Sequence, residues 1–76
     1  KPVKLEAKKV HRHPQKQEFH FKYEDHMKNK ELLFHAQKLK RIEKEFLVFL
    51  DHGKEIFIPL HRVTQIMHKE KIHWKA

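Results

Sequence analysis

The sequence predicts a small, mainly β domain, built as an antiparallel sheet or a partly open barrel with short helical turns; an α+β fold is the alternative. Phe19, Phe21 and Tyr23 alternate with polar residues, which is typical of a half-buried strand. Two apolar runs, residues 46–50 and 56–58, flank a short polar turn that contains the only glycine. This order of apolar run, glycine turn and second apolar run indicates a β-hairpin.

The length of 76 residues allows one domain, residues 1–76, with a thin hydrophobic core. Within it we expect residues 1–16 to form a basic N-terminal arm or short helix and residues 17–75 to form a β-rich body. Eight aromatic residues can support a core, which argues against disorder. The chain has no cysteine, so a disulfide framework and a cysteine-based zinc site are excluded.

The first residues hold scattered apolar side chains between Pro2 and Pro14, so residues 4–11 either form a short helix or remain an arm. The chain does not begin with Met and has no signal-peptide pattern. We therefore expect a mature, trimmed or excised segment. The absence of cysteine suits an intracellular protein, cytoplasmic or nuclear.

Residues 32–44 are ambiguous. Apolar residues recur there at helical spacing, and Asn29 could cap such a helix. The opposing interpretation is two short strands around a helical turn. A weak internal repeat favours the strands, because Leu39 and Ile42 recur 24 residues later as Val63 and Ile66. We expect short elements here and no long helix.

The rest of the chain is predicted to be strand-rich. Residues 46–50 are almost continuously apolar and should form a central strand, and Gly53 supplies the positive φ of the following turn. Pro59 has no N–H to donate and should end the return strand. A short element around residues 63–67 and a last strand around Ile72 follow.

The net charge of +8 is concentrated at the two ends of the chain. Residues 1–16 carry a surplus of +5, residues 17–57 are neutral, and residues 58–76 carry +3. A neutral body with basic ends points to a polyanion, either nucleic acid or an anionic membrane surface. A generally solubilising charge, or that of a ribosome-associated protein, is the plainer interpretation. The longest apolar run is far shorter than the roughly 20 residues of a membrane span.

The stretch IPLHRV holds the first candidate site, His61 and Arg62. Because the strand must turn at Pro59, both side chains should lie on an exposed rim. The planar fork of arginine suits phosphate, and histidine can add a second donor. The alternative is an ordinary charged turn.

A second candidate closes the first predicted strand with Tyr23, Asp25 and His26. An aromatic ring, a carboxylate and an imidazole at a strand end could recognise a ribose or a base edge. Alternatively, Asp25 caps a turn beside a core tyrosine.

The histidines also raise metal binding and catalysis. His11 and His13 are the only close pair, and no zinc-binding motif is present, so we predict no metal site and no cofactor. Two imidazoles and a lysine can cleave RNA by general acid–base transfer. A chain with nine histidines meets that requirement by chance, so we assign no catalytic residue. Trp74, the only tryptophan, is better explained by core packing than by base stacking.

Together, the segments RIEKEFLVFLDHGKEIFIPLHRVTQI, FKYEDH and IHW resemble the small RNA cyclic-group end recognition domain. The resemblance covers roughly residues 10–75, and IPLHRV with Ile66 is its most specific part. His61 and Arg62 match the His-Arg pair of that family, and Tyr23 with Asp25 matches its upstream motif. His26 stands where Arg is usual. Arg12-His13-Pro14 replaces a frequent Trp-Asp-Pro, and Lys75 replaces a frequent Asp.

This resemblance implies a β-rich, non-enzymatic module that recognises RNA ends carrying a 2′,3′-cyclic phosphate or a 2′-phosphate in RNA repair or processing. It implies that His61 and Arg62 grip the phosphate while Tyr23 and Asp25 position the ribose. RNA ends are commonly recognised by stacking and by phosphate and 2′-oxygen contacts. The remaining RNA-binding residues that we expect are His26, Arg12, Lys8, Lys9, Trp74 and Lys75.

The expected partners are RNA, single-stranded or with a phosphorylated 3′ end, and a covalently linked or associated RNA-processing enzyme; a membrane is not expected. Two other classes stay open. One is a small His/Lys-dependent enzyme that processes RNA ends. The other is a basic structural domain that binds ribosomal RNA or protein. The sequence does not predict the oligomeric state.

Overall fold

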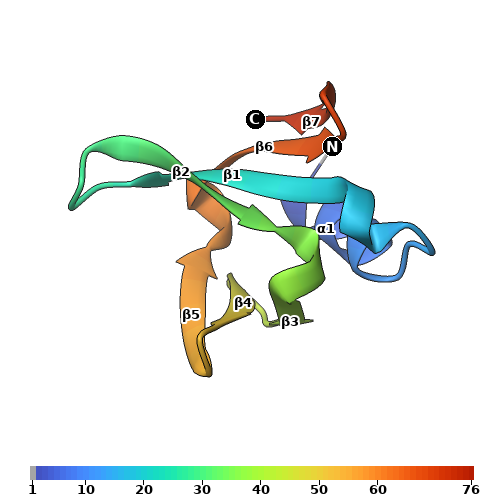
Figure 1. The fold of residues 1–76 in the computed structure, drawn as a ribbon. Helices are drawn as coiled ribbons and strands as arrows, with labels where there is room; N and C mark the ends of the chain where they lie inside the picture. The colour runs from blue at the N-terminus through green and yellow to red at the C-terminus, as the bar shows by residue number, and fades with distance from the viewer. Residues whose placement is uncertain (1) are drawn as a thin grey trace.

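A computed structural model describes residues 2–76 and has a mainly β fold, as the sequence predicts, with 53% of the residues in strands (Figure 1). The elements are α1 (Val3–His11), η1 (Lys16–Glu18), β1 (Phe19–Asp25), β2 (Lys30–His35), η2 (Ala36–Lys38), β3 (Leu39–Ile42), β4 (Phe46–Asp51), β5 (Lys54–Pro59), η3 (Leu60–Arg62), β6 (Val63–His68) and β7 (Lys71–Lys75), where η marks a 3₁₀ helix.

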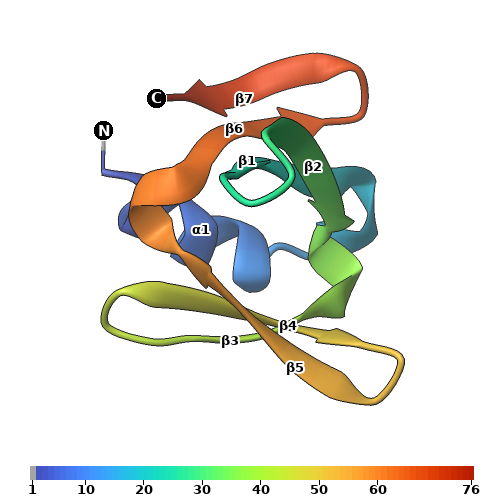
Figure 2. The same ribbon diagram turned by 90° about the vertical axis from the view of Figure 1, so that its left-hand side faces the viewer.

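The strands form two small antiparallel sheets, ordered β2-β1-β6-β7 and β3-β4-β5, and they do not close into a barrel. In Figure 2 the two sheets lie one above the other, with α1 between them on one side. Buried aromatic rings join the sheets. Phe34 of β2 stacks on Phe49 of β4 with ring centroids 4.8 Å apart, and Phe21 of β1 meets Phe49 edge-on at 5.6 Å. These contacts make one continuous core.

The basic N-terminal segment forms the expected short helix. Ala7 and Val10 of α1 are completely or almost completely buried and belong to the same core cluster as the strands. The exposed positions of the helix include Lys8 and Lys9. The helix is therefore part of the core, and its outer face carries the charge.

Residues 32–44 form short elements, as expected: the end of β2, the turn η2 and then β3. The alternative helix does not form, because β2 pairs along its whole length with β1, and Tyr23 lies opposite Leu32. Asn29 has φ 52° and lies in the hairpin turn before β2. Local helical periodicity is here outweighed by strand pairing.

The internal repeat corresponds to a pseudo-twofold arrangement of the chain. Each half consists of a hairpin, a 3₁₀ turn and a third strand: β1-β2-η2-β3 and β4-β5-η3-β6. Each third strand pairs with the first strand of the other half, since β3 pairs with β4 and β6 pairs with β1. Leu39 and Val63 occupy equivalent positions directly after η2 and η3. Positions in one half can therefore be compared with those in the other.

The hairpin at residues 46–59 is confirmed, and β4 is the central strand of its sheet. His52 and Gly53, with φ 51° and 78°, form its two-residue turn. Positive φ at both central positions is characteristic of a type I′ turn. Pro59 is the last residue of β5 to pair with β4, as expected.

Candidate functional site

Arg62 ends the 3₁₀ turn η3, which begins directly after Pro59. Its side chain is half-buried, and its Nε atom is buried without a hydrogen-bond partner. Among residues 2–76, no hydrogen bond or ion pair involves the guanidinium group. Leaving a charged donor buried and unpaired is unfavourable, so such groups in native proteins call for an explanation.

Arg62 lines a surface pocket of about 210 Å³ at the end of β1. The pocket brings Arg62 together with Tyr23 and Asp25, two of the residues that the sequence indicates for RNA binding. The other residues around it are Glu24, Met27, Ile56, Phe57, Ile58 and Pro59. The pocket therefore joins the end of β1 to β5 and η3, which come from the other half of the chain.

Tyr23 is buried, with 9% of its surface exposed, and stacks on Phe34, with the rings nearly parallel at 5.9 Å. Burial raises the pKa of Tyr23, and the charges of Asp25 and Asp51 raise it further. The hydroxyl therefore stays protonated at neutral pH and can donate a hydrogen bond. None of the described residues forms a hydrogen bond with it.

Asp25 caps the turn between β1 and β2, as the plainer sequence interpretation predicts. Its Oδ1 atom accepts hydrogen bonds from the backbone N–H groups of Met27 and Lys28 at 3.0 and 3.1 Å. These two donors partly compensate the carboxylate charge on one side. Asp25 is therefore held rigidly at the pocket, where it can accept a hydrogen bond from a hydroxyl group.

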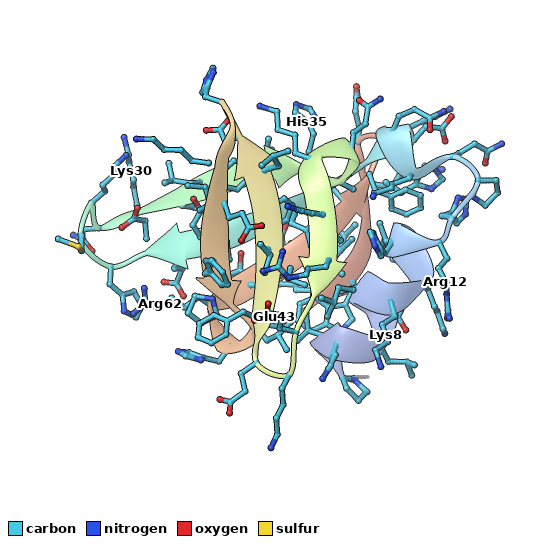
Figure 3. All side chains as sticks on the ribbon, turned by 90° about the horizontal axis from the view of Figure 1, so that it is seen from below. Lys8, Arg12, Lys30, His35, Glu43 and Arg62 are labelled. Atoms are coloured by element: carbon cyan, nitrogen blue, oxygen red, sulfur yellow. The ribbon has the colours of Figure 1, made fainter. Side chains whose placement is uncertain are left out.

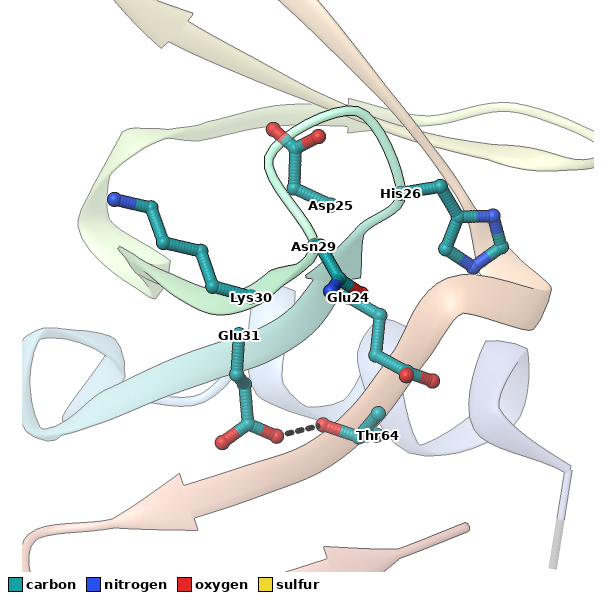
Figure 4. A pocket seen from close by; sticks show the side chains of 7 residues that line it. All are labelled: Glu24, Asp25, His26, Asn29, Lys30, Glu31 and Thr64. Carbon is teal, nitrogen blue, oxygen red and sulfur yellow. Dashed lines mark hydrogen bonds between the residues drawn. The ribbon is translucent and has the colours of Figure 1, made fainter.

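His26 points into a different, larger pocket of about 410 Å³, on the other side of this turn (Figure 4). Three carboxylates line it, those of Glu24, Asp25 and Glu31, and Thr64 Oγ1 donates a 2.7 Å hydrogen bond to Glu31. Lys30 lines this pocket too, and Glu24 and Asp25 are shared with the Arg62 pocket. His26 itself does not line the Arg62 pocket.

The pseudo-twofold relation gives the Arg62 and Asp25 positions an equivalent pair elsewhere in the fold, and the two pairs differ. The position equivalent to Arg62 is Lys38 at the end of η2, and Asp51 at the end of β4 corresponds to Asp25. There Lys38 Nζ of the first half donates to Asp51 Oδ1 of the second half at 3.0 Å, so the two charges neutralise each other. No such pair joins Arg62 to Asp25 in the described part of the chain. The cation of the second half is free for an external anion.

The other expected site residues lie elsewhere. His61 is exposed next to Arg62 but does not line the pocket. Trp74 is half-buried against the core, opposite Ile66, as the sequence suggests. Lys75 is exposed on β7. These side chains do not form one cluster with Arg62.

The basic residues of α1 form a second group. Lys8 and Arg12 line a shallow surface depression of about 320 Å³ together with His11, Arg41 and Ile42. Figure 3 shows Lys8 and Arg12 on one side of the three-stranded sheet and Arg62 on the other. Lys9 is instead paired with Glu6 at 3.5 Å. Of the cations in and directly after α1 that are expected to bind RNA, Lys8 and Arg12 make no ion pair within the described residues.

Several histidines pack around one phenylalanine, which the sequence did not indicate. His68 stacks on Phe19 at 4.2 Å, and His13 and His73 contact the same ring at 4.9 and 5.4 Å. His68 also bonds Glu18 at 2.8 Å, a contact that lowers the pKa of this carboxyl group. Packing and ion pairing therefore account for these imidazoles. No group of three or more residues that could hold a metal ion is found among residues 2–76.

Two features of the site were missed by sequence reasoning: the pairing state of Arg62 and the presence of Phe57 at the same pocket. Both depend on contacts between distant segments.

No helix in residues 2–76 is long and apolar enough to cross a membrane. Comparisons with models of protein families, with curated proteins and with solved structures find no match for this chain.

Proposed function

We propose that this protein is a non-enzymatic RNA-binding module that docks phosphorylated RNA 3′ ends, carrying a 2′,3′-cyclic phosphate or a 2′-phosphate, in RNA repair or processing. The observation that carries the proposal is Arg62, a half-buried arginine whose Nε has no partner and which lines a pocket with Tyr23 and Asp25. The resemblance of the IPLHRV segment to an RNA-end recognition family implies the same ligand.

The chemistry of the pocket suits a terminal phosphate on a ribose. The guanidinium of Arg62 offers several N–H donors in one plane, a geometry that matches phosphate oxygens. The protonated hydroxyl of Tyr23 adds a donor, and the carboxylate of Asp25 can accept from a ribose hydroxyl. His61 lies next to Arg62 and is the nearest candidate for a contact outside the pocket. An associated or covalently linked RNA-processing enzyme would be the partner that uses the bound end.

The test compares two substitutions that each remove one positive charge at equivalent positions of the two halves, Arg62→Gln and Lys38→Gln. Binding is measured by titration with matched RNAs that differ only in a cyclic-phosphate, 2′-phosphate or hydroxyl 3′ end. A charge-assisted hydrogen bond contributes roughly 1.5–3 kcal/mol, so Arg62→Gln should weaken binding of phosphorylated ends by about tenfold or more. Lys38→Gln should leave the preference for phosphorylated ends unchanged.

Arg62→Lys adds a geometric control, because it keeps the charge and removes the planar fork. It should weaken binding to the phosphorylated end more than binding to the hydroxyl end. If Arg62→Lys and Arg62→Gln reduce binding to all ends equally, or to none, the end-recognition mechanism is wrong. Binding that ignores the terminal group would support the structural-domain alternative, and conversion of the cyclic phosphate during the titration would support the enzyme alternative.

A further inference from the structure

The outer face of the three-stranded sheet carries an exposed aromatic pair. Along β4 and β5, Leu47, Phe49 and Ile58 face the core, so by alternation Phe46 and Phe57 face outward. The two outward rings remain 38% and 46% exposed and meet edge-to-face, with centroids 6.0 Å apart. Exposed apolar patches can mark the sites at which a protein binds a partner or ligand.

Phe57 connects this face to the Arg62 pocket, because it also lines that pocket. Another arginine, Arg41, lies over the Phe57 ring at 5.9 Å. Its guanidinium is held by hydrogen bonds to Glu43 at 2.8 Å and Glu55 at 2.9 Å, so its charge is compensated. Arg62, which shares a pocket with Phe57, makes no ion pair among residues 2–76 and is therefore available to an anionic ligand.

We propose that Phe57, with Phe46 beside it, is the base-stacking platform for the terminal nucleotides of a single-stranded RNA whose end phosphate binds Arg62. This inference rests on the proposed function. A terminal nucleotide carries its base and its phosphate on one sugar, so one ligand can reach both Arg62 and Phe57 at the same pocket. Every base has a π-face, and aromatic side chains stack on it without strong sequence preference.

Charge favours RNA over the other occupants of an apolar face. A second copy of this chain also carries a net charge of +8, and the repulsion between two molecules of like net charge opposes association. An RNA strand brings negative charge beside Arg62. In Figure 3 the sheet face lies between Arg62 and the pair Lys8 and Arg12, so a strand that crosses it from the Arg62 pocket would approach a second cationic group.

The experiment uses the full chain and two RNAs with the same 3′ phosphate, one with a normal terminal base and one abasic at that position. Stacking predicts that the normal RNA binds roughly 5- to 150-fold more tightly. Phe57→Leu keeps an apolar side chain but removes the π-face, so it should abolish most of this difference. Ile72→Ala, at a 54% exposed site on β7, is the control and should retain it. Circular dichroism checks that each variant folds. Phe46→Leu is a second variant, and it should reduce the difference in affinity between the normal and abasic RNAs less than Phe57→Leu does.

The inference is overturned if Phe57→Leu and Phe46→Leu bind the normal and abasic RNAs with the same ratio as the unsubstituted chain. It is also overturned if sedimentation shows a dimer that Phe57→Leu dissociates, since the face would then join two copies. The two proposals fail separately. Phe57→Leu should preserve the preference for phosphate over hydroxyl ends, which Arg62→Gln removes, and Arg62→Gln should preserve the preference for a base over an abasic end.

Discussion

At the scale of single residues, the Arg62 pocket is defined by polar groups that the fold leaves without partners. The Nε of Arg62 is buried without a hydrogen-bond partner, and no described residue bonds the hydroxyl of Tyr23, which lines the same pocket. The equivalent cation Lys38 is neutralised by Asp51 at 3.0 Å. Unpartnered polar groups reduce stability, and a bound ligand that supplies the missing hydrogen bonds would recover that free energy.

Tyr23→Phe separates a binding role of this hydroxyl from a structural role. No described residue bonds the hydroxyl, so its removal should leave the free energy of unfolding unchanged or slightly higher. If the hydroxyl donates to the RNA end, affinity should fall by roughly 2- to 10-fold, which corresponds to about 0.5–1.5 kcal/mol for one neutral hydrogen bond. Urea unfolding and the RNA titration measure the two quantities. A loss of stability with unchanged affinity would make Tyr23 a structural residue.

At the scale of elements, the β4-β5 hairpin positions Phe57 and the residues before η3. Its register pairs Asp51 with Lys54 and Phe46 with Pro59, so the two-residue turn fixes which side chains face outward. A slip by one residue would turn Phe57 inward and the core residue Ile58 outward. The turn geometry therefore affects the proposed stacking face directly.

Gly53→Ala tests the turn. The glycine has φ 78°, and a Cβ atom there would contact nothing within 4 Å, so the cost comes from the backbone alone. We expect a loss of about 1–2 kcal/mol in the free energy of unfolding, the usual penalty for an L-residue in the left-handed region. Gly53→Asn should cost less, because asparagine tolerates this region. Equal losses for both variants in chemical denaturation would contradict this explanation.

At the scale of the whole molecule, part of the basic surplus lies on α1, a helix that is also part of the core. Deleting the first residues would remove Ala7 and with it core packing, so truncation cannot isolate the charge. Substitution of the exposed cations can, because Lys8 and Arg12 make no ion pair among residues 2–76. A long-range electrostatic contribution should depend on these two side chains and on ionic strength.

Lys8→Gln combined with Arg12→Gln should lower the salt dependence of RNA binding. For single strands each lost phosphate contact reduces the slope of log affinity against log salt concentration by about 0.7, so the double variant should lose roughly 1.4. Lys38→Gln, whose cation is already paired, should change the slope little. An unchanged slope in the double variant would mean that the RNA does not reach α1. The thermal unfolding temperature should be nearly unchanged by these substitutions of Lys8, Arg12 and Lys38.

The sequence by itself determined the local elements and the sign of the charge. Alternating aromatics in β1, the apolar run of β4 and the glycine turn act over a few residues, so their pattern predicts strands and a hairpin without knowledge of the fold. For residues 32–44 the sequence pattern is ambiguous, because the same apolar spacing suits a helix and a strand–turn–strand. Pairing of β2 with β1 decided between them.

Only the tertiary structure decided which of the candidate residues act together. Tyr23 and Arg62 come from opposite halves of the chain and meet because β6 returns to pair with β1. His26, Lys8 and Arg12 are directed to other surfaces by the same topology. The tertiary structure also decides whether a cation has a partner. Lys38 is paired with Asp51, whereas Arg62 has no partner among the described residues. Such contacts between distant residues leave no local pattern in the sequence.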